Sequence, residues 1–131
     1  MQSNNQLKCL FDYTKFHIGV YMTLIGLLLA TVIKPGALDN MPHHVYQVIR
    51  VVIICYVLAG AAGGAIISNI PNYETFKQYD DERLPIFSFK TLKYRHWATI
   101  EHGAFWIGSI TLIVGLLFFT GCHAQCSTPS R

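Results

Sequence analysis

Residues 51–70 read VVIICYVLAGAAGGAIISNI, and this stretch contains no Asp, Glu, Lys or Arg. Two further stretches, 16–33 and 103–121, share that property. At about 1.5 Å of rise per residue, roughly 20 helical residues cross a hydrocarbon core about 30 Å thick. The sequence therefore predicts an all-α integral membrane protein with three transmembrane helices.

The composition agrees with this prediction. Hydrophobic residues make up 52% of the chain and charged residues 13%, whereas a soluble domain carries about 25% charged residues. A soluble three-helix bundle, the alternative, would place charges on the outer face of every helix. The basic residues stand beside the span ends and form no separate patch, so we expect a lipid bilayer as partner and no nucleic acid.

The chain is expected to form a single transmembrane domain. The predicted boundaries are 1–131 for the domain, about 16–33, 48–70 and 98–121 for the spans, and 71–97 for the inner loop. Pro35 and Gly36 end the first helix, because Pro cannot continue it and Gly adopts the conformations of a helix end. Lys8 and Lys15 ahead of the first span would also suit a signal peptide, but no small-x-small cleavage site follows. We therefore interpret the first span as a retained helix.

The distribution of Lys and Arg predicts the orientation. The amino-terminal segment and the second loop together hold seven of them, and the opposite side holds three. Because short loops rich in Lys and Arg stay in the cytoplasm, the amino terminus should be cytoplasmic and the carboxyl terminus outside. We expect a bacterial inner membrane.

The second loop mixes charges with aromatic residues, a composition typical of segments at the headgroup layer. Tyr73, Phe76 and Tyr79 recur at helical spacing, which predicts a short interfacial helix that ends before Pro85. Residues 84–92 are expected to be extended. The alternative is a loop that binds a partner protein.

Small residues recur at heptad spacing in two spans. These stripes are Gly19, Thr23, Gly26 and Ala30 in the first helix and Ala104, Gly108, Thr111 and Gly115 in the third. Small faces let helix backbones approach closely in a membrane, so we expect both stripes to pack against other helices. The second helix carries small residues on every side, including the pair Gly60 and Gly64. Other helices can therefore pack against it from two sides at once, so we expect it to lie between the other two. The rival interpretation is that its surplus small face forms a homodimer.

Two carboxylates lie on the expected packing faces. Glu101 precedes Ala104 by one turn, and Asp12 precedes Gly19 by two turns. Ionisable groups inside a bundle suggest function. The alternative is that they anchor helix ends at the membrane interface, with Glu101 paired to Arg95 or Lys15.

His17 and His102 stand at comparable depths in the first and third helices. Such a pair could bind a haem or pass a proton. His17 is about 200° around the helix from Gly19, so it points away from the small stripe, and this direction argues against both roles. We expect two interfacial histidines beside aromatic residues and no bound cofactor.

A second group of possible ligands lies on the other side of the membrane. It comprises Met41, His43 and His44 of the first loop with Cys122, His123 and Cys126 of the tail. Such side chains bind copper or zinc. The alternatives are free thiols, or a Cys122–Cys126 disulfide that requires the helix to end at Gly121.

No sequence motif identifies an enzyme: a phosphate-binding loop, a G-x-S-x-G elbow and an H-E-x-x-H motif are all missing from the sequence. The leading hypothesis is a non-enzymatic accessory subunit or small scaffold that binds other membrane proteins or its own copies. The alternative is a redox, metal or proton-handling protein that uses the inner His and Glu residues or the outer Cys and His residues.

Overall fold

Three long helices make up most of the protein. The structure is a computed structural model that describes the backbone of residues 2–33, 41–86 and 89–126 and the side chains of residues 5–33, 41–85 and 92–118. The helices are α1 (Gln2–Val32), α2 (His43–Asn69) and α4 (Tyr94–Cys126). Each contains a segment long and apolar enough to cross a membrane, as the sequence predicted. All three helices are longer than the predicted spans, and α1 begins well before residue 16.

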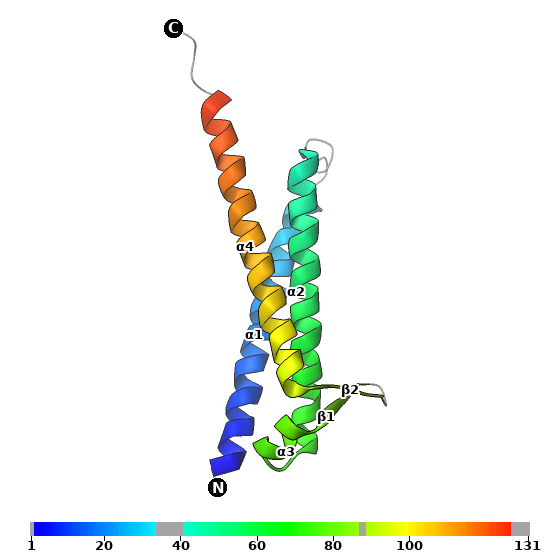
Figure 1. The fold of residues 1–131 in the computed structure, drawn as a ribbon. Coiled ribbons are helices and arrows are strands. Elements are labelled where there is room, and N and C mark those ends of the chain that lie inside the picture. Colours follow the sequence, from blue (N-terminus) through cyan, green and yellow to red (C-terminus); the bar gives the residue numbers. More distant parts are fainter. Residues whose placement is uncertain (1, 34–40, 87–88, 127–131) are drawn as a thin grey trace.

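A short folded segment connects α2 to α4. It consists of η1 (Ile70–Asn72), α3 (Phe76–Asp81), β1 (Arg83–Ile86) and β2 (Phe89–Lys93). Thr75 caps α3, because its side chain accepts a hydrogen bond from the backbone N–H of Gln78 at 3.3 Å. The short helix thus ends before Pro85 as predicted, and the expected extended chain is an antiparallel hairpin. Figure 1 shows α3 beside the start of α1, and the hairpin projecting on the other side, next to the end of α2 and the start of α4; we call this the hairpin end of the bundle.

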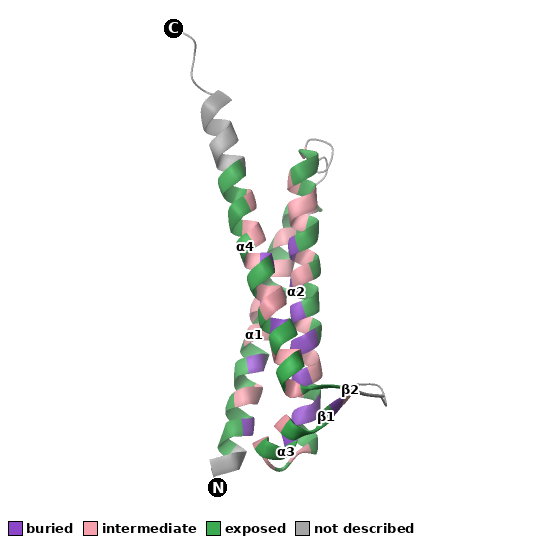
Figure 2. Ribbon diagram, in the orientation of Figure 1, coloured by how far each residue is buried: buried purple, intermediate pink, exposed green. Residues whose placement is uncertain are grey.

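The second long helix lies between the other two and packs against both. Most of its buried residues recur at heptad spacing, namely Val52, Tyr56, Ala59, Gly63 and Ile66, and Ile70 of η1 continues the series. Such spacing keeps one seam of a helix in contact with its neighbours. Figure 2 shows this buried seam along α2, whereas much of α1 and α4 is exposed.

The packing face of α1 differs from the expected one. Its buried residues are Leu7, Thr14 and Tyr21, each seven residues from the next. Gly19 and Gly26 are exposed, and a Cβ atom at either would meet no other side chain within 4 Å. The close approach comes instead from α2, where a Cβ at Gly63 would lie 3.1 Å from Ile18. The small residues of α2 alone allow the two helices to approach closely, so larger side chains of α1 pack against them.

The small stripe of α4 does face α2. A Cβ at Gly108 would lie 3.0 Å from Cys55, and one at Gly115 would lie 2.7 Å from Val48. Ala104 is half-buried on the same side. Gly60 and Gly64 of α2 have no neighbouring atom within 4 Å of a Cβ, so the contact expected at this pair occurs one residue away, at Gly63.

A hydrophobic core at the hairpin end attaches the connecting segment to the long helices. It contains Leu7 of α1, Ile66 of α2, Ile70 of η1, Tyr79 of α3 and Leu84 of β1. The Tyr79 hydroxyl donates a hydrogen bond to the Ile66 carbonyl at 2.8 Å. Burial raises the pKa of this phenol, which therefore stays a donor. The contacts fix α3 and the hairpin against the ends of the bundle.

Candidate functional site

Glu101 is a carboxylic acid buried inside the bundle. Its residue is 1% exposed, and it lies seven residues into α4, about 10 Å from the start of the helix. It precedes Gly108 and Gly115 at heptad spacing, on the side of α4 that faces α2. The sequence therefore directs this carboxyl group inward, in a segment apolar enough to cross a membrane.

Two side chains of α1 converge on one oxygen of this carboxyl group. The Tyr21 hydroxyl donates a hydrogen bond to Glu101 Oε1 at 3.1 Å, and His17 Nδ1 lies 3.7 Å from the same oxygen. Arg95, an expected partner, instead binds Asp80 at 2.7 Å, and Lys15 is exposed. In the part of the chain that the structure describes, Glu101 has no Lys or Arg partner. The expected pairing of Glu101 with Arg95 or Lys15 is therefore wrong.

His17 faces the bundle with an unsatisfied nitrogen. Its Nδ1 atom is buried and has no hydrogen-bond partner among the described residues. The 3.7 Å distance to Glu101 is longer than a hydrogen bond, which spans about 2.7–3.2 Å. The ring of Tyr13 packs edge-on against the imidazole, with centroids 4.0 Å apart. A small movement of either side chain would bring the nitrogen and the carboxyl oxygen into contact.

His102 is bound at both ring nitrogens. Its Nδ1 atom lies 2.8 Å from the Ala98 carbonyl oxygen, and a carbonyl only accepts, so Nδ1 carries the hydrogen. In the neutral ring Nε2 then accepts the hydrogen bond from the Tyr13 hydroxyl, at 3.2 Å. The rings of His17 and His102 are perpendicular, with centroids 6.1 Å apart. In this arrangement His102 has no free nitrogen to offer a haem iron.

Further polar groups lie deeper in the bundle. The Tyr56 hydroxyl of α2 is 3.2 Å from the Ser109 hydroxyl of α4. The ring of Tyr56 stacks on that of Tyr21, with centroids 6.5 Å apart. Polar groups thus extend about 12 Å along α4, from Glu101 to Ser109. Stacked rings, not a hydrogen bond, join the two parts of this row.

The pairing of Glu101 with His17 allows the site to be neutral in two ways. Either the carboxyl group holds one proton beside a neutral imidazole, or the proton has moved and a carboxylate faces an imidazolium. Both forms contain the same single proton. A net charge in an apolar interior is costly, so the site favours the forms that share a single proton. A gain or loss of a proton requires access to water.

The other predicted residues do not join this cluster. Asp12 is exposed on the face of α1 that also carries Gly19, so the prediction that it points into the bundle is corrected by the same change of packing face. His43 and His44 are exposed, and His43 Nε2 lies 3.3 Å from Gln47 Nε2. Among the described residues no group of three possible metal ligands occurs.

The tail residues of the expected metal site lie only partly within the described structure. The side chains of Cys122, His123 and Cys126 are outside the described residues. The backbone of α4, however, continues as a helix to Cys126. The helix end at Gly121 that a Cys122–Cys126 disulfide requires is therefore not present.

Tyr13 and Tyr21 are the functional residues that the sequence interpretation missed. A signal for them exists, because Tyr13, His17 and Tyr21 are spaced by four residues and so lie along one side of a helix. The direction of His17 away from Gly19 was inferred correctly. The error was to assume that the small stripe marked the inside of the bundle.

Comparisons with protein-family models, with curated proteins and with solved structures find no match to this chain.

Proposed function

We propose that this chain is a multi-pass membrane protein that binds and releases a proton at Glu101 and His17. The observation that carries the proposal is the burial of Glu101 beside an unsatisfied His17 nitrogen, with Tyr21 as its hydrogen-bond donor. Ionisable groups turned into a transmembrane bundle are costly and usually serve proton or ion pathways.

A route for the proton to reach water supports this proposal. The His17 side chain is 25% exposed, although its Nδ1 atom is buried. Tyr13 contacts both His17 and His102, and Tyr13 and His102 are exposed. A proton that leaves Glu101 therefore has a titratable neighbour with access to the surface. The opposite direction leads to Tyr56 and Ser109, hydroxyl groups that can relay but not store a proton.

The orientation proposed for the chain gives this route a direction. With the amino terminus in the cytoplasm of a bacterial inner membrane, Tyr13 and His102 open toward the cytoplasmic side. Glu101 would then exchange its proton with the cytoplasm.

Infrared difference spectroscopy of the protein in lipid vesicles tests the proton site. We expect the carbonyl stretch of a protonated carboxyl group to change reversibly with pH in the natural protein. Glu101→Gln should abolish that signal, and Glu82→Gln, which changes an exposed glutamate, should leave it intact. His17→Gln should keep Glu101 protonated over the whole range, because a carboxylate would then lack its cationic partner.

Proton uptake provides the functional measurement. After an external acid jump in a weakly buffered medium, vesicles that contain the natural protein should take up more protons from the medium than protein-free vesicles do. With Glu101→Gln this extra uptake should fall. Uptake that Glu101→Gln leaves unchanged, or a natural protein whose carboxyl signal does not respond to pH, would overturn the proposal.

A second proposed function is the accessory subunit or scaffold that the sequence favours. What supports it is a row of large exposed residues on α4, comprising Trp106, Ile107, Ile110 and Ile113. Such a surface suits either lipid or another membrane protein. Purification in a gentle detergent, followed by identification of co-purifying proteins, tests it. A partner retained by the natural protein and lost with Ile110→Ser would support this role, and a partnerless protein would contradict it.

A further inference from the structure

The hairpin places two cationic residues directly opposite each other. Arg83 of β1 pairs with Lys93 of β2 in the antiparallel register, and both residues are exposed. Residues opposite each other in such a pair have Cβ atoms about 4.5–5.5 Å apart, so the two side chains start from neighbouring points. Like charges in this arrangement repel each other and destabilise a hairpin. An anion bound between them would offset that repulsion.

Within the described residues, no acidic side chain forms an ion pair with Arg83 or Lys93. Lys93 helps to lower the pKa of Asp80, so that carboxylate is near. Both oxygens of Asp80, however, already accept hydrogen bonds from Arg95, at distances between 2.7 and 3.2 Å. Glu82 precedes Arg83 in extended chain, where successive side chains point to opposite sides. The positive charge of the pair is therefore unmatched in this part of the chain.

The hairpin lies at the depth where a membrane interface is expected. Lys93 directly precedes α4, whose apolar segment begins at Tyr94. Figure 1 shows the hairpin projecting sideways from the bundle, roughly across the direction of the long helices. Because the long helices would cross the bilayer, a segment that projects sideways at their ends runs along the headgroup layer and reaches over lipid. Leu92, an exposed apolar neighbour of Lys93, also suits this layer.

We propose that Arg83 and Lys93 bind the phosphate group of an anionic phospholipid beside the bundle. A guanidinium presents two parallel N–H donors to a phosphate, and a lysine ammonium adds a further charged donor. A phosphate in this place attracts both cations and offsets their repulsion. A zwitterionic lipid fits less well, because the cation of its own headgroup competes for its phosphate.

The lipid site and the proton site are separate. Among the hydrogen bonds and ion pairs of the described residues, none joins Arg83 or Lys93 to Glu101 or His17. The inference requires the three spans to be inserted in a bilayer, but it does not require proton uptake. Lipid binding can therefore fail while proton uptake is intact, and the reverse also holds.

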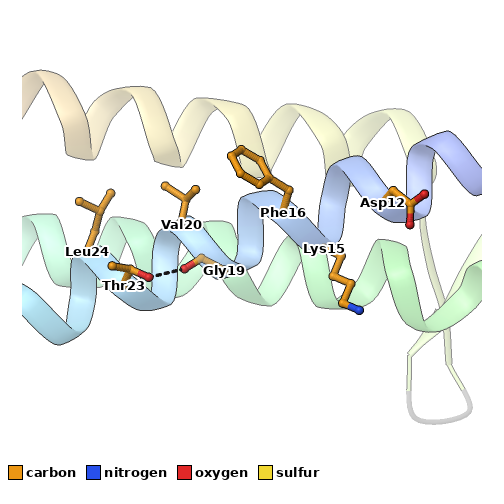
Figure 3. Close-up of a pocket in the computed structure, with 7 residues that line it drawn as sticks. All are labelled: Asp12, Lys15, Phe16, Gly19, Val20, Thr23 and Leu24. Atoms are coloured by element: carbon orange, nitrogen blue, oxygen red, sulfur yellow. Dashed lines mark hydrogen bonds between the residues drawn. The ribbon is translucent and has the colours of Figure 1, made fainter.

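Lys15 offers a matched control. It is an exposed cationic residue of α1, and Figure 3 shows it along a shallow groove that Asp12 also lines. Lys15 stands one helical turn from this acid instead of opposite a second cation. Lys15→Gln and Lys93→Gln remove the same charge, so the first variant reports the effect of overall charge alone.

Quenching of tryptophan fluorescence by brominated lipids measures the binding. Trp97 is one helical turn from Lys93, and Trp106→Phe leaves it as the single tryptophan. This protein is placed in phosphatidylcholine vesicles that contain an equal fraction of either brominated phosphatidylglycerol or brominated phosphatidylcholine. The anionic lipid should quench Trp97 more strongly. Arg83→Gln and Lys93→Gln should each reduce this preference about fivefold, because each removes one cation from the membrane surface.

The control variants distinguish a paired site from a general attraction to lipid. Lys15→Gln should leave the preference unchanged, and Arg83→Lys, which keeps the charge, should retain most of it. Equal quenching by the two lipids, or an equal loss with Lys15→Gln, would overturn the inference.

Two other occupants of the pair would also overturn it. If inorganic phosphate at constant ionic strength abolishes the preference, the pair binds a free anion. If an acidic protein co-purifies with the natural protein and is lost with Arg83→Gln, the pair binds that protein.

Discussion

The burial and the neighbours of a single residue in this protein depend on the side chains of the helix that faces it. Glu101 is buried because heptad spacing directs it toward α2, and its neighbours are a histidine and a tyrosine instead of a base. Gly115 and Gly60 are equivalent in the sequence, as glycines within apolar helices. In the structure one lies against Val48 and the other faces no atom within 4 Å.

Replacement of these two glycines by alanine tests the packing of α2 against α4. At Gly115 the new Cβ atom would lie 2.7 Å from a methyl group of Val48, a branched side chain with little freedom to move. We expect Gly115→Ala to lower the free energy of unfolding by about 1–3 kcal/mol. Gly60→Ala should cause no loss, because it has room and alanine favours helix. Unfolding of the protein in detergent, followed by circular dichroism, measures both, and equal stability of the two variants would contradict this packing.

At the scale of elements, the two sides of α1 differ in burial. One side carries the buried residues Leu7, Thr14 and Tyr21, and the other carries the exposed small stripe. The connecting segment between α2 and α4 is likewise held by specific contacts. Tyr79 attaches α3 to the last turn of α2, and the Arg95–Asp80 ion pair attaches α3 to the first turn of α4.

The Arg95–Asp80 pair should make the docking of α3 dependent on pH. The hydrogen bonds from Arg95 lower the pKa of Asp80 below its ordinary value. Because the folded pKa is the lower one, the stabilisation is complete above the unfolded pKa of about 3.9 and is lost as the pH falls through the folded value. Asp80→Asn should therefore lower the thermal midpoint slightly at neutral pH and lower it less at an acidic pH below the unfolded pKa.

A matched control for this variant is Asp81→Asn, which changes an exposed neighbour that forms no ion pair with Arg95 in the described structure. Its thermal midpoint should follow that of the natural protein at both pH values. A gap between Asp80→Asn and the natural protein that stays constant with pH would contradict the ion-pair explanation.

For the whole molecule, the arrangement is a middle helix contacted from both sides and closed at one end by a small folded segment. The start of α1, α3 and the hairpin share that end, and the first residues of α2 lie at the other. Three helices that each suffice to cross a membrane separate these two ends. The proposed orientation places the hairpin end in the cytoplasm.

Labelling of single cysteines in intact cells tests that orientation. Cys9 is exposed at the hairpin end, and His44 is exposed at the start of α2. With every other cysteine replaced by serine, Cys9 should react with a membrane-impermeant thiol reagent only after the cells are opened. His44→Cys in a cysteine-free background should react in intact cells. The reverse pattern would show that the amino terminus is outside.

The sequence predicted the three long helices, the short helix before Pro85 and the inward direction of Glu101. These features follow from local patterns: apolar length, the helical spacing of aromatic residues and the position of Glu101 one turn before Ala104. The face that α1 turns to α2 could not be predicted in the same way. Small residues on α1 and on α2 are equally able to provide a close contact, and only one of the two surfaces is used, at Gly63.

The sequence by itself determined that the chain forms three helices long and apolar enough to cross a membrane, because apolar length and missing charge are properties of each segment alone. It also placed an acid, two histidines and their tyrosines at similar positions along two helices. Only the tertiary structure decided that Glu101, His17 and Tyr21 meet, and that Asp12 and Gly19 do not face the bundle. Which side of a helix is buried depends on the fit between two surfaces, and neither surface specifies that fit alone.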